Sequence, residues 1–190
     1  MTKQEHIINT ALSLFYNKGL HAVGINEILA ESKVAKKTLY NHFISKDELI
    51  CACLAKRDTH FSSWFEEICN KPFAIEVAIS LFAGLQLWFT NQVPKLGDFN
   101  GCFFINAAAE YPDAQHPIAI QCMQHKKTIL DIILAALLTT PELKDNKVKA
   151  LEIARTLLTL KEGLTCQARV MHNQSLVMPS TALLKHIIQS

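Results

Sequence analysis

The stretch "VAKKTLYNHFISKDEL", residues Val34–Leu49, has two different faces when it is wound into a helix. Leu39 and Phe43 are four residues apart, so with Val34 they point to one side and can enter a core. The other side and its edges carry only basic, hydroxyl, amide and imidazole groups: Lys36, Lys37, Thr38, Tyr40, Asn41 and His42. Lysines neutralise phosphates, while hydroxyl and amide groups bond phosphate oxygens or base edges. The pattern is typical of a helix placed on nucleic acid.

The residues after this helix add a second feature that suits a phosphate. Ser45 and Glu48 form the capping box S-x-x-E, which predicts that a new helix begins at Lys46. The free backbone N–H groups of its first turn favour an anion. Between Ser32 and Lys46 the chain has four lysines and no acidic residue, which makes a local positive patch although the net charge is only +2.

Helical periodicity extends along nearly the whole chain of 190 residues, and no run of alternating β-branched residues is present. A capping box at Thr2 and Glu5 opens the first helix, and Lys18-Gly19 closes it. Short helices around 25–31 and 34–43 follow, and their tight connection predicts a helix-turn-helix. Further helices are expected over residues 46–70, 73–90, 102–110, 117–138, 146–171 and 180–189. We therefore expect an all-α protein of about nine helices, with a small N-terminal helix-turn-helix domain at 1–45 and a larger helical bundle at 46–190.

The composition disfavours several other classes of protein. No apolar run reaches the roughly 18–20 residues of a membrane span, and the N-terminus lacks a signal-peptide pattern, so we expect a cytoplasmic protein without a membrane partner. The six cysteines are scattered, which favours free thiols and gives no metal site. No nucleophile elbow, glycine-rich phosphate loop or H-E-x-x-H motif is present, so we expect neither an enzyme nor a cofactor.

Two segments, Thr38–Phe43 and Ser45–Leu49, resemble the TetR family of repressors. The hallmarks of that family are a T-x-Y-x-H-F ending of the recognition helix and a Ser-Lys-Asp/Glu-Glu-Leu start of the next helix. The likeness is specific over about residues 4–50, and "GCFFINAAAEYPD" at 101–113 is similar to one branch of the family. The resemblance implies that Tyr40 and Lys46 contact backbone phosphates, while the remaining residues of the polar face lie in or beside the major groove. It also implies a homodimeric repressor that binds double-stranded operator DNA and responds to a small-molecule effector.

Three positions depart from the family pattern. Lys33 stands where the turn before the recognition helix usually has glycine, which costs strain if that position needs a positive φ. Ala35 replaces the usual serine N-cap, a loss of about 1 kcal/mol of capping. Lys37 replaces a glycine within the recognition helix, which favours the helix and adds charge.

The resemblance implies an effector pocket among the fourth to seventh helices, and the residues there suggest its chemistry. Aromatic and aliphatic side chains recur one helical turn apart, and a cysteine and an amide follow on a short helix: Phe61, Phe65, Leu85, Phe89, Cys102 and Asn106. With few ionisable groups among them, they predict a mainly apolar or aromatic effector held by ring contacts and one or two hydrogen bonds. Aromatic residues at this spacing can equally be core.

Two alternative functions remain open at this point. Cys102 begins a helix, where a thiolate is favoured, so the chain can also be read as a repressor that senses electrophiles or oxidants through this thiol. A small buried residue would give the same pattern. A helical adaptor that does not bind DNA is the other alternative, but it leaves the arrangement of lysines between Lys36 and Lys46 unexplained.

The last two expected helices predict how the chain assembles. Each carries an apolar stripe at helical spacing: Ile153, Leu157, Leu160 and Leu164 on the eighth, and Leu184, Ile187 and Ile188 on the ninth. Such stripes must be covered, and a two-fold partner covers them economically. We therefore expect a four-helix dimer interface.

Overall fold

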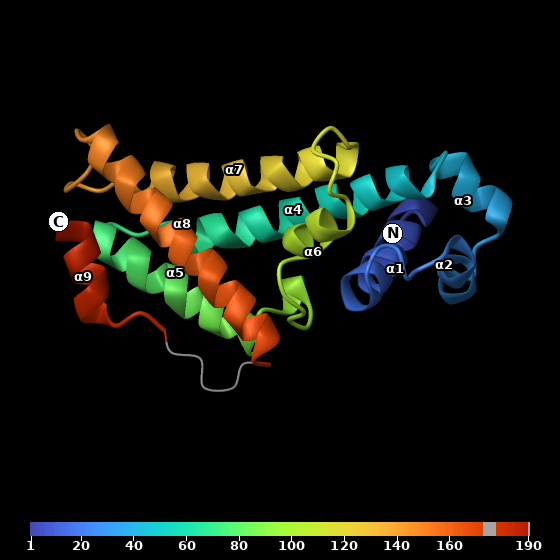
Figure 1. The fold of residues 1–190 in the computed structure, drawn as a ribbon, viewed down its shortest axis with the longest axis horizontal. Coiled ribbons are helices and arrows are strands. Elements are labelled where there is room, and N and C mark those ends of the chain that lie inside the picture. The colour runs from blue at the N-terminus through green and yellow to red at the C-terminus, as the bar shows by residue number, and fades with distance from the viewer. Residues whose placement is uncertain (173–177, 190) are drawn as a thin grey trace. The chain divides into compact units, whose positions relative to one another are not determined.

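The fold was analysed in a computed structural model, which describes residues 1–172 and 178–189. Within these residues the chain forms nine α-helices and one short 3₁₀ helix, and no strand (Figure 1). In chain order they are α1 Lys3–Lys18, α2 Ile25–Ser32, α3 Lys36–His42, α4 Lys46–Cys69, α5 Ala74–Phe89, the 3₁₀ helix η1 Pro94–Leu96, α6 Phe103–Glu110, α7 Pro117–Leu138, α8 Lys147–Val170 and α9 Thr181–Gln189. The all-α prediction is confirmed, and the expected capping box is present at Thr2 with Glu5. At the start of α4 the Ser45 hydroxyl accepts from the N–H of Glu48, but the Glu48 carboxylate accepts from the N–H of Ile44 in place of that of Ser45.

The described residues form two compact units that do not follow the expected boundary between residues 45 and 46. The first unit comprises Met1–Thr59 and Cys102–His125, and the second comprises His60–Gly101 and Lys126–Ser190 as far as the structure describes it. Helices α4 and α7 therefore each contribute to both units. The difference has a physical cause, because α6 and the start of α7 share an apolar core with the N-terminal helices.

The core of the first unit joins the helix-turn-helix to α6. Leu39 and Phe43 of the predicted inner face of α3 are buried in it, as are Phe15 of α1 and Phe103 of α6. Tyr16 and Phe103 make an edge-to-face contact with ring centroids 5.9 Å apart. The burial of apolar area from both segments stabilises them as one body.

A carboxylate at the C-terminal end of α6 holds the turn that follows α1. Glu110 accepts a hydrogen bond from the backbone N–H of Leu20 at 2.7 Å and another from that of His21 at 2.6 Å, one on each carboxylate oxygen. The ring of His21 stacks on Tyr111 and bonds the Glu110 carbonyl oxygen at 2.9 Å. Gly19 has φ 96°, which favours glycine, and a Cβ there would lie in a tight contact, 3.2 Å from the carboxylate oxygen of Glu110.

The same segment also contacts the start of α4. Tyr111 donates a hydrogen bond to Asp47 at 3.2 Å, and His116 lies 3.4 Å from the other oxygen of that carboxylate. Burial, together with the nearby Asp47, raises the pKa of Tyr111 to about 12, so the phenol stays a donor at physiological pH. Residues 110–116 are therefore bonded both to the turn after α1 and to the first turn of α4.

The second unit has an aromatic core with one buried charge. Phe61, Trp64, Phe65, Trp88 and Phe89 pack with neighbouring ring centroids between 5.1 and 6.2 Å apart. The ammonium of Lys161, which is fully buried, lies 5.4 Å from the centroid of the Phe61 ring. A cation over a ring face is attracted by the ring quadrupole.

Glu162 compensates the charge of Lys161. Its two carboxylate oxygens accept from Lys161 at 2.9 Å and from Lys126 at 2.8 Å. Burial alone would raise the pKa of Glu162, but the two ammonium groups outweigh it and hold the pKa below its usual value. The pair is thus charged at neutral pH, and it ties α8 to α7 within the second unit.

Lys33, the C-cap of α2, has the left-handed conformation, with φ 56° and ψ 24°. Lys33→Gly should stabilise the protein by about 1 kcal/mol in urea unfolding, since glycine adopts this conformation without steric cost. Lys37→Gly, the same change inside α3, is the matched control and should destabilise by about 1 kcal/mol. Shifts of the same sign in both variants would contradict the strain at Lys33.

Candidate nucleic-acid interface and ligand cavities

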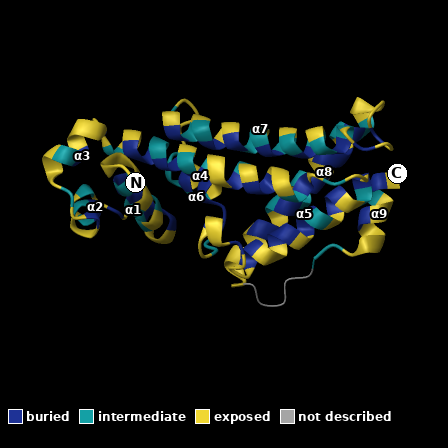
Figure 2. Cartoon of the chain, turned by 180° about the vertical axis from the view of Figure 1, so that it is seen from behind, coloured by how far each residue is buried: buried dark blue, intermediate teal, exposed yellow. Residues whose placement is uncertain are grey.

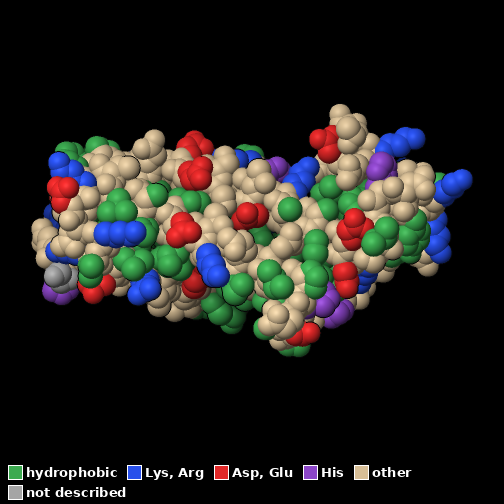
Figure 3. Space-filling view, turned by 90° about the horizontal axis from the view of Figure 1, so that it is seen from above, with side chains coloured by type: hydrophobic (Ala, Val, Ile, Leu, Met, Phe, Trp, Pro, Cys, Tyr) green, Lys and Arg blue, Asp and Glu red, His purple; other side chains and the backbone are tan. Residues whose placement is uncertain are grey.

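The outer side of α3 carries the predicted DNA-binding residues on the surface of the first unit. Lys36, Lys37, Asn41 and His42 are exposed, Thr38 is half-buried, and Tyr40 is 43% exposed. The ammonium of Lys36 lies 6.0 Å from the centroid of the Tyr40 ring, so the two groups stand side by side. Leu39 and Phe43, by contrast, are buried in the core and fix the rotation of the helix. Figure 3 shows blue Lys and Arg side chains at the right-hand end of the view, where α3 lies.

The start of α4 places Lys46 next to this face. Ser45 caps the helix by accepting from the backbone N–H of Glu48 at 3.1 Å, and Glu48 reaches back to the N–H of Ile44 at 2.6 Å. Lys46 is half-buried, and its ammonium lies 5.9 Å from the centroid of the Phe15 ring. The aliphatic part of the Lys46 side chain therefore lies against α1. At α3 the N-cap is Ala35, which makes no side-chain capping bond, as the sequence predicted.

The residues expected to bind an effector do not form a single lined cavity. Phe61, Phe65, Leu85 and Phe89 are all buried in the aromatic core of the second unit, and none of them lines a described pocket. Cys102 and Asn106 belong to the first unit. Close packing fills the space in which a ligand was expected, because large rings one turn apart on α4 and α5 interdigitate.

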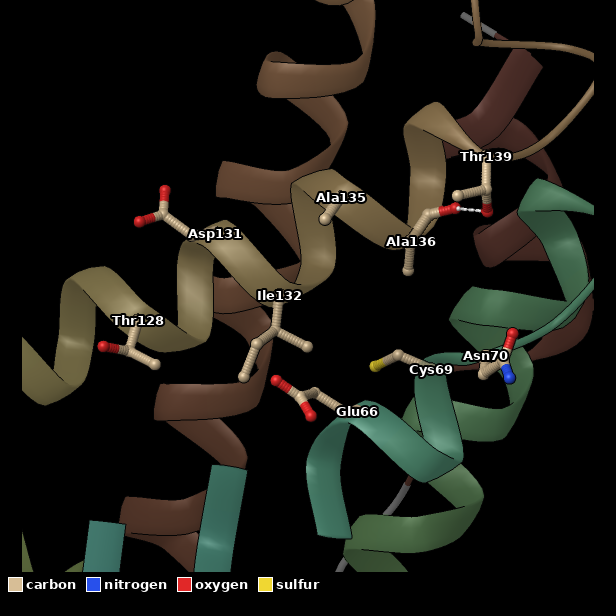
Figure 4. A pocket seen from close by; sticks show the side chains of 9 residues that line it. All are labelled: Glu66, Cys69, Asn70, Thr128, Asp131, Ile132, Ala135, Ala136 and Thr139. Carbon is tan, nitrogen blue, oxygen red and sulfur yellow. Dashed lines mark hydrogen bonds between the residues drawn. The ribbon is translucent and has the colours of Figure 1, made fainter. Parts of the chain in front are cut away.

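The largest described pocket is an open groove of about 520 Å³ between α4 and α7 in the second unit (Figure 4). Cys69 and Ile132 point into it, and Ala135 and Ala136 line it along α7. Glu66 and Asp131 add two exposed carboxylates. Such a groove lacks the enclosed polar groups that orient a ligand.

A smaller cavity, of about 270 Å³, lies in the first unit between α4, α6 and α7. His125, only 2% exposed, forms one wall, with its Nδ1 2.5 Å from the Asp58 carboxylate. Its ring stacks on Phe104 at a centroid distance of 3.5 Å and an interplanar angle of 8°. Gln121, on the helical turn before His125, also lines the cavity.

Sequence reasoning missed this group of residues for an identifiable reason. His125 and Asp58 are 67 positions apart, so no spacing rule connects them. The only signal available was the similarity of residues 101–113 to one branch of the family, which covers Phe104 and Glu110.

The six cysteines have different environments. Burial raises the pKa of Cys51, Cys53 and Cys69, which makes them weak nucleophiles at neutral pH. Cys102 is buried at the N-cap of α6, and it interacts electrostatically with the buried guanidinium of Arg57. Cys166 is exposed on α8. Among the described residues, no cluster of His, Cys, Asp and Glu side chains is arranged to hold a metal ion.

The predicted dimer stripe lies mainly on the inner side of α8 and α9. Most of its side chains are buried in the core of their own unit, namely Ile153, Leu157, Leu164, Leu184 and Ile188, while Leu160 and Ile187 are half-buried. The apolar side of an amphipathic helix covers its own core first. Figure 2 shows buried residues alternating with exposed ones along the helices. On α8 the exposed residues include Thr159, Gly163, Cys166 and Val170.

None of the described helices is long and apolar enough to cross a membrane.

Comparison with known proteins finds sequence similarity to a family model and to curated relatives. Residues 7–53 match the family model described as bacterial regulatory proteins, tetR family. An HTH-type transcriptional regulator from the lacX 3' region of Lactococcus lactis subsp. lactis is 37% identical over 67 residues, which are 35% of this chain and 33% of that protein. The transposon Tn10 TetC protein of Escherichia coli is 41% identical over 49 residues, 26% of this chain and 25% of that protein. The chain thus spans about a third or less of the length of these curated relatives.

Solved structures extend the likeness over the whole chain. A TetR-family transcriptional regulator from Streptomyces coelicolor is 27% identical, with a TM-score of 0.77 over 98% of this chain and 92% of that one. The reduced form of Escherichia coli NemR has a TM-score of 0.77 over 100% of this chain and 96% of that chain, and at 18% identity it shares the fold. The family model covers the helix-turn-helix and the structures cover all nine helices. Residues 7–53 therefore match the TetR family of bacterial regulatory proteins, and the fold of the whole chain is similar to that of TetR-family regulators.

Proposed function

We propose that the protein is a ligand-responsive transcriptional repressor that binds operator DNA as a homodimer. The observation that supports it most directly is the division of α3 into a buried side, Leu39 and Phe43, and an exposed side of basic and hydrogen-bonding residues. In a helix-turn-helix such a side enters the major groove, while neighbouring groups bind phosphates. The match of residues 7–53 to a family of regulatory proteins agrees with the expectation that the chain is not an enzyme.

The exposed residues are proposed to divide into two roles. Tyr40 and Lys46 lie where the helix meets the flanking strand of DNA, so they bond phosphates and fix the register without reading sequence. Lys37 and Asn41 lie one turn apart on the exposed side of α3, and their side chains suit a guanine edge and an adenine edge respectively. Lys36, Thr38 and His42 complete the contact surface.

Operator binding should separate these two roles. With an operator selected from random DNA, Lys46→Ala should weaken binding to all sequences and lower the slope of log affinity against log salt by about 2 per dimer, one phosphate from each subunit. Tyr40→Phe should weaken binding with little change in slope, because the lost group is neutral. Asn41→Ala should instead reduce discrimination at one base position per half-site.

Mobility shifts over a salt series provide the measurement. Lys147→Ala is the matched control, since it removes an exposed lysine from α8 and should leave affinity and slope unchanged. A Tyr40→Ala/Lys46→Ala double variant that binds as tightly as the parent would contradict the assignment of this face.

The homodimer is proposed to form through the exposed face of α8, with Leu183 of α9 beside it. Thr159, Gly163, Cys166 and Val170 follow one another at intervals of four, three and four residues, so they share one face. Gly163 is a helix-interior glycine, yet no described atom lies within 4 Å of where its Cβ would be. A glycine inside a helix lowers stability by about 1 kcal/mol, and packing within the chain gives no reason for it here. The close approach of a second helix, for which a side chain would leave no room, is such a reason. Val170 of this face is an exposed apolar group, and Leu183 of α9 is another.

Sedimentation velocity tests this face. The parent should be a dimer at micromolar concentration, and Gly163→Arg should be a monomer with an unchanged circular dichroism spectrum, because two copies of the charge would meet across the two-fold axis. Ala135→Arg is the matched control, since it places the same charge on an exposed face of α7 and should remain a dimer. A dimeric Gly163→Arg variant would exclude this surface.

A second candidate function, a repressor that senses electrophiles or oxidants through Cys102, is favoured by one observation. The buried guanidinium of Arg57 interacts with Tyr16 and with Cys102. An anionic oxidation product such as a sulfenate or sulfinate at Cys102 would have a cationic partner there. A reversible effector needs no such partner, so the two candidates differ in their dependence on the thiol.

Cys102→Ser separates them. If the effector binds reversibly, the variant should still release operator DNA with only a modest change in effector affinity. If sensing is covalent, release by hydrogen peroxide or N-ethylmaleimide and the mass adduct on the protein should both disappear. Cys166→Ser is the matched control for the exposed thiol. Loss of all induction in Cys102→Ser, with folding and operator binding intact, would establish the covalent function in place of the reversible one.

A further inference from the structure

We propose that Lys33, in the turn between α2 and α3, is an additional phosphate-binding residue that anchors the protein on DNA beside the recognition helix. The inference deepens the proposed function and rests on it, since it presupposes that α3 enters the major groove. It gives a role to the one lysine between Ser32 and Lys46 that the proposed contact surface does not include.

The backbone of Lys33 has a conformation that disfavours a side chain. Its φ of 56° and ψ of 24° lie in the left-handed region. Among the described residues, the other non-glycine residues with a positive φ are Asn91 and His172. Asparagine and histidine occur in this region several times more often than other residues, whereas lysine has no such tolerance. Strained residues of this kind persist where the surroundings enforce them, and they gather at functional sites.

Hydrogen bonds on both sides of the strained residue fix the turn. The N–H of Lys33 donates to the carbonyl oxygen of Leu29 at 2.9 Å and closes α2. The carbonyl oxygen of Ser32 accepts from Nε2 of His6 on α1 at 2.9 Å. The side chain of Lys33 therefore leaves from a preformed position, which reduces the entropy lost when it binds an anion.

The fold itself makes no visible use of the Lys33 ammonium. Its side chain is exposed, and within residues 1–172 and 178–189 it forms no ion pair with a carboxylate. Lys18, at the end of α1, differs because its ammonium is bound by Glu27. The positive charge of Lys33 is thus available to an anion from outside the chain.

The way in which a helix-turn-helix docks places this turn beside phosphates. The first helix of the motif crosses the DNA backbone, and the N-terminal residues of the second contact base edges in the major groove. Here these helices are α2 and α3, so the connection 33–35 lies where the chain passes from the backbone into the groove. Lys33 is the cationic residue of that connection. A long cationic side chain at the edge of the groove neutralises a phosphate and carries no sequence information.

Three substitutions at this position separate the charge from the strain. Lys33→Gln removes the charge and keeps the strain, Lys33→Gly removes both, and Lys33→Arg keeps both. In mobility shifts on the selected operator, the glutamine and glycine variants should lower the slope of log affinity against log salt by about 2 per dimer, one phosphate from each subunit. Their loss of affinity should then grow about three- to fourfold for each halving of the salt concentration. Lys33→Arg should keep the slope of the parent.

Urea unfolding adds a readout that a purely structural role would not combine with the first. Lys33→Gly should raise the unfolding midpoint while it weakens DNA binding, so stability and affinity should move in opposite directions. Lys33→Gln should leave the midpoint unchanged and yet show the same salt slope as Lys33→Gly. Lys127→Gln, which removes an exposed lysine from α7, is the matched control and should behave as the parent in both measurements.

Unrelated DNA of the same length decides what Lys33 contacts. The loss of affinity should be the same factor on this DNA as on the operator, because phosphates are present on both. A loss confined to the operator would make Lys33 a base-reading residue and overturn the phosphate assignment.

Two other outcomes would also overturn the inference. A Lys33→Gln variant with the affinity and salt slope of the parent would exclude the contact. An equal loss in Lys33→Arg would assign the effect to the shape of the turn and not to its charge. Failure of the proposed function is recognised separately, because the parent itself would then bind no selected DNA.

Discussion

The Glu110 carboxylate accepts hydrogen bonds from the backbone N–H groups of Leu20 and His21, and the first unit depends on this constraint. Hydrogen bonds to a charged acceptor contribute about 1.5–3 kcal/mol each, more than neutral ones, and here both go to the turn between α1 and α2. Gly19 suits this turn because its φ of 96° is strained for other residues. Through these bonds α6 belongs to the same body as the helix-turn-helix, although Leu20 and Glu110 are 90 positions apart in the chain.

The second unit depends on a different kind of constraint, a buried charge that must stay paired. Lys161 lies on the inner side of α8 among aromatic rings, and Glu162 with Lys126 keeps its charge compensated. Removing one partner of such a group is far more costly than replacing the whole pair. The rotation of α8 about its axis is thereby fixed, with Ile153 and Leu157 inward and Gly163 and Cys166 outward.

Local features of the sequence predicted much of this fold, and non-local ones did not. Helix ends such as Lys18-Gly19 and Ser45-Lys46 were predictable because capping boxes and glycine act within four residues of chain. The two faces of α3 were predictable for the same reason. On α8, however, the apolar stripe could cover either the chain's own core or a partner, since periodicity gives a helix one apolar face without saying what covers it. The pairs His125 with Asp58 and Glu110 with Leu20 join distant segments, which no periodicity encodes.

The position of α6 also changes how a ligand signal would reach DNA. A shift carried only along α4 must act through the length of a 24-residue helix. A small rotation of that helix must then change the distance between the two recognition helices of a dimer. Adjacent half-sites on DNA fix that distance at about 34–36 Å. A shift of α6 acts more directly, because Glu110 and Tyr111 bond the turn after α1 and the first turn of α4. Allosteric coupling free energies of about 1–3 kcal/mol are common, and each hydrogen bond to the Glu110 carboxylate contributes a free energy of that size. In the proposed ligand-responsive repressor, weakening these bonds in one of two states would change DNA binding without any large rearrangement of the core.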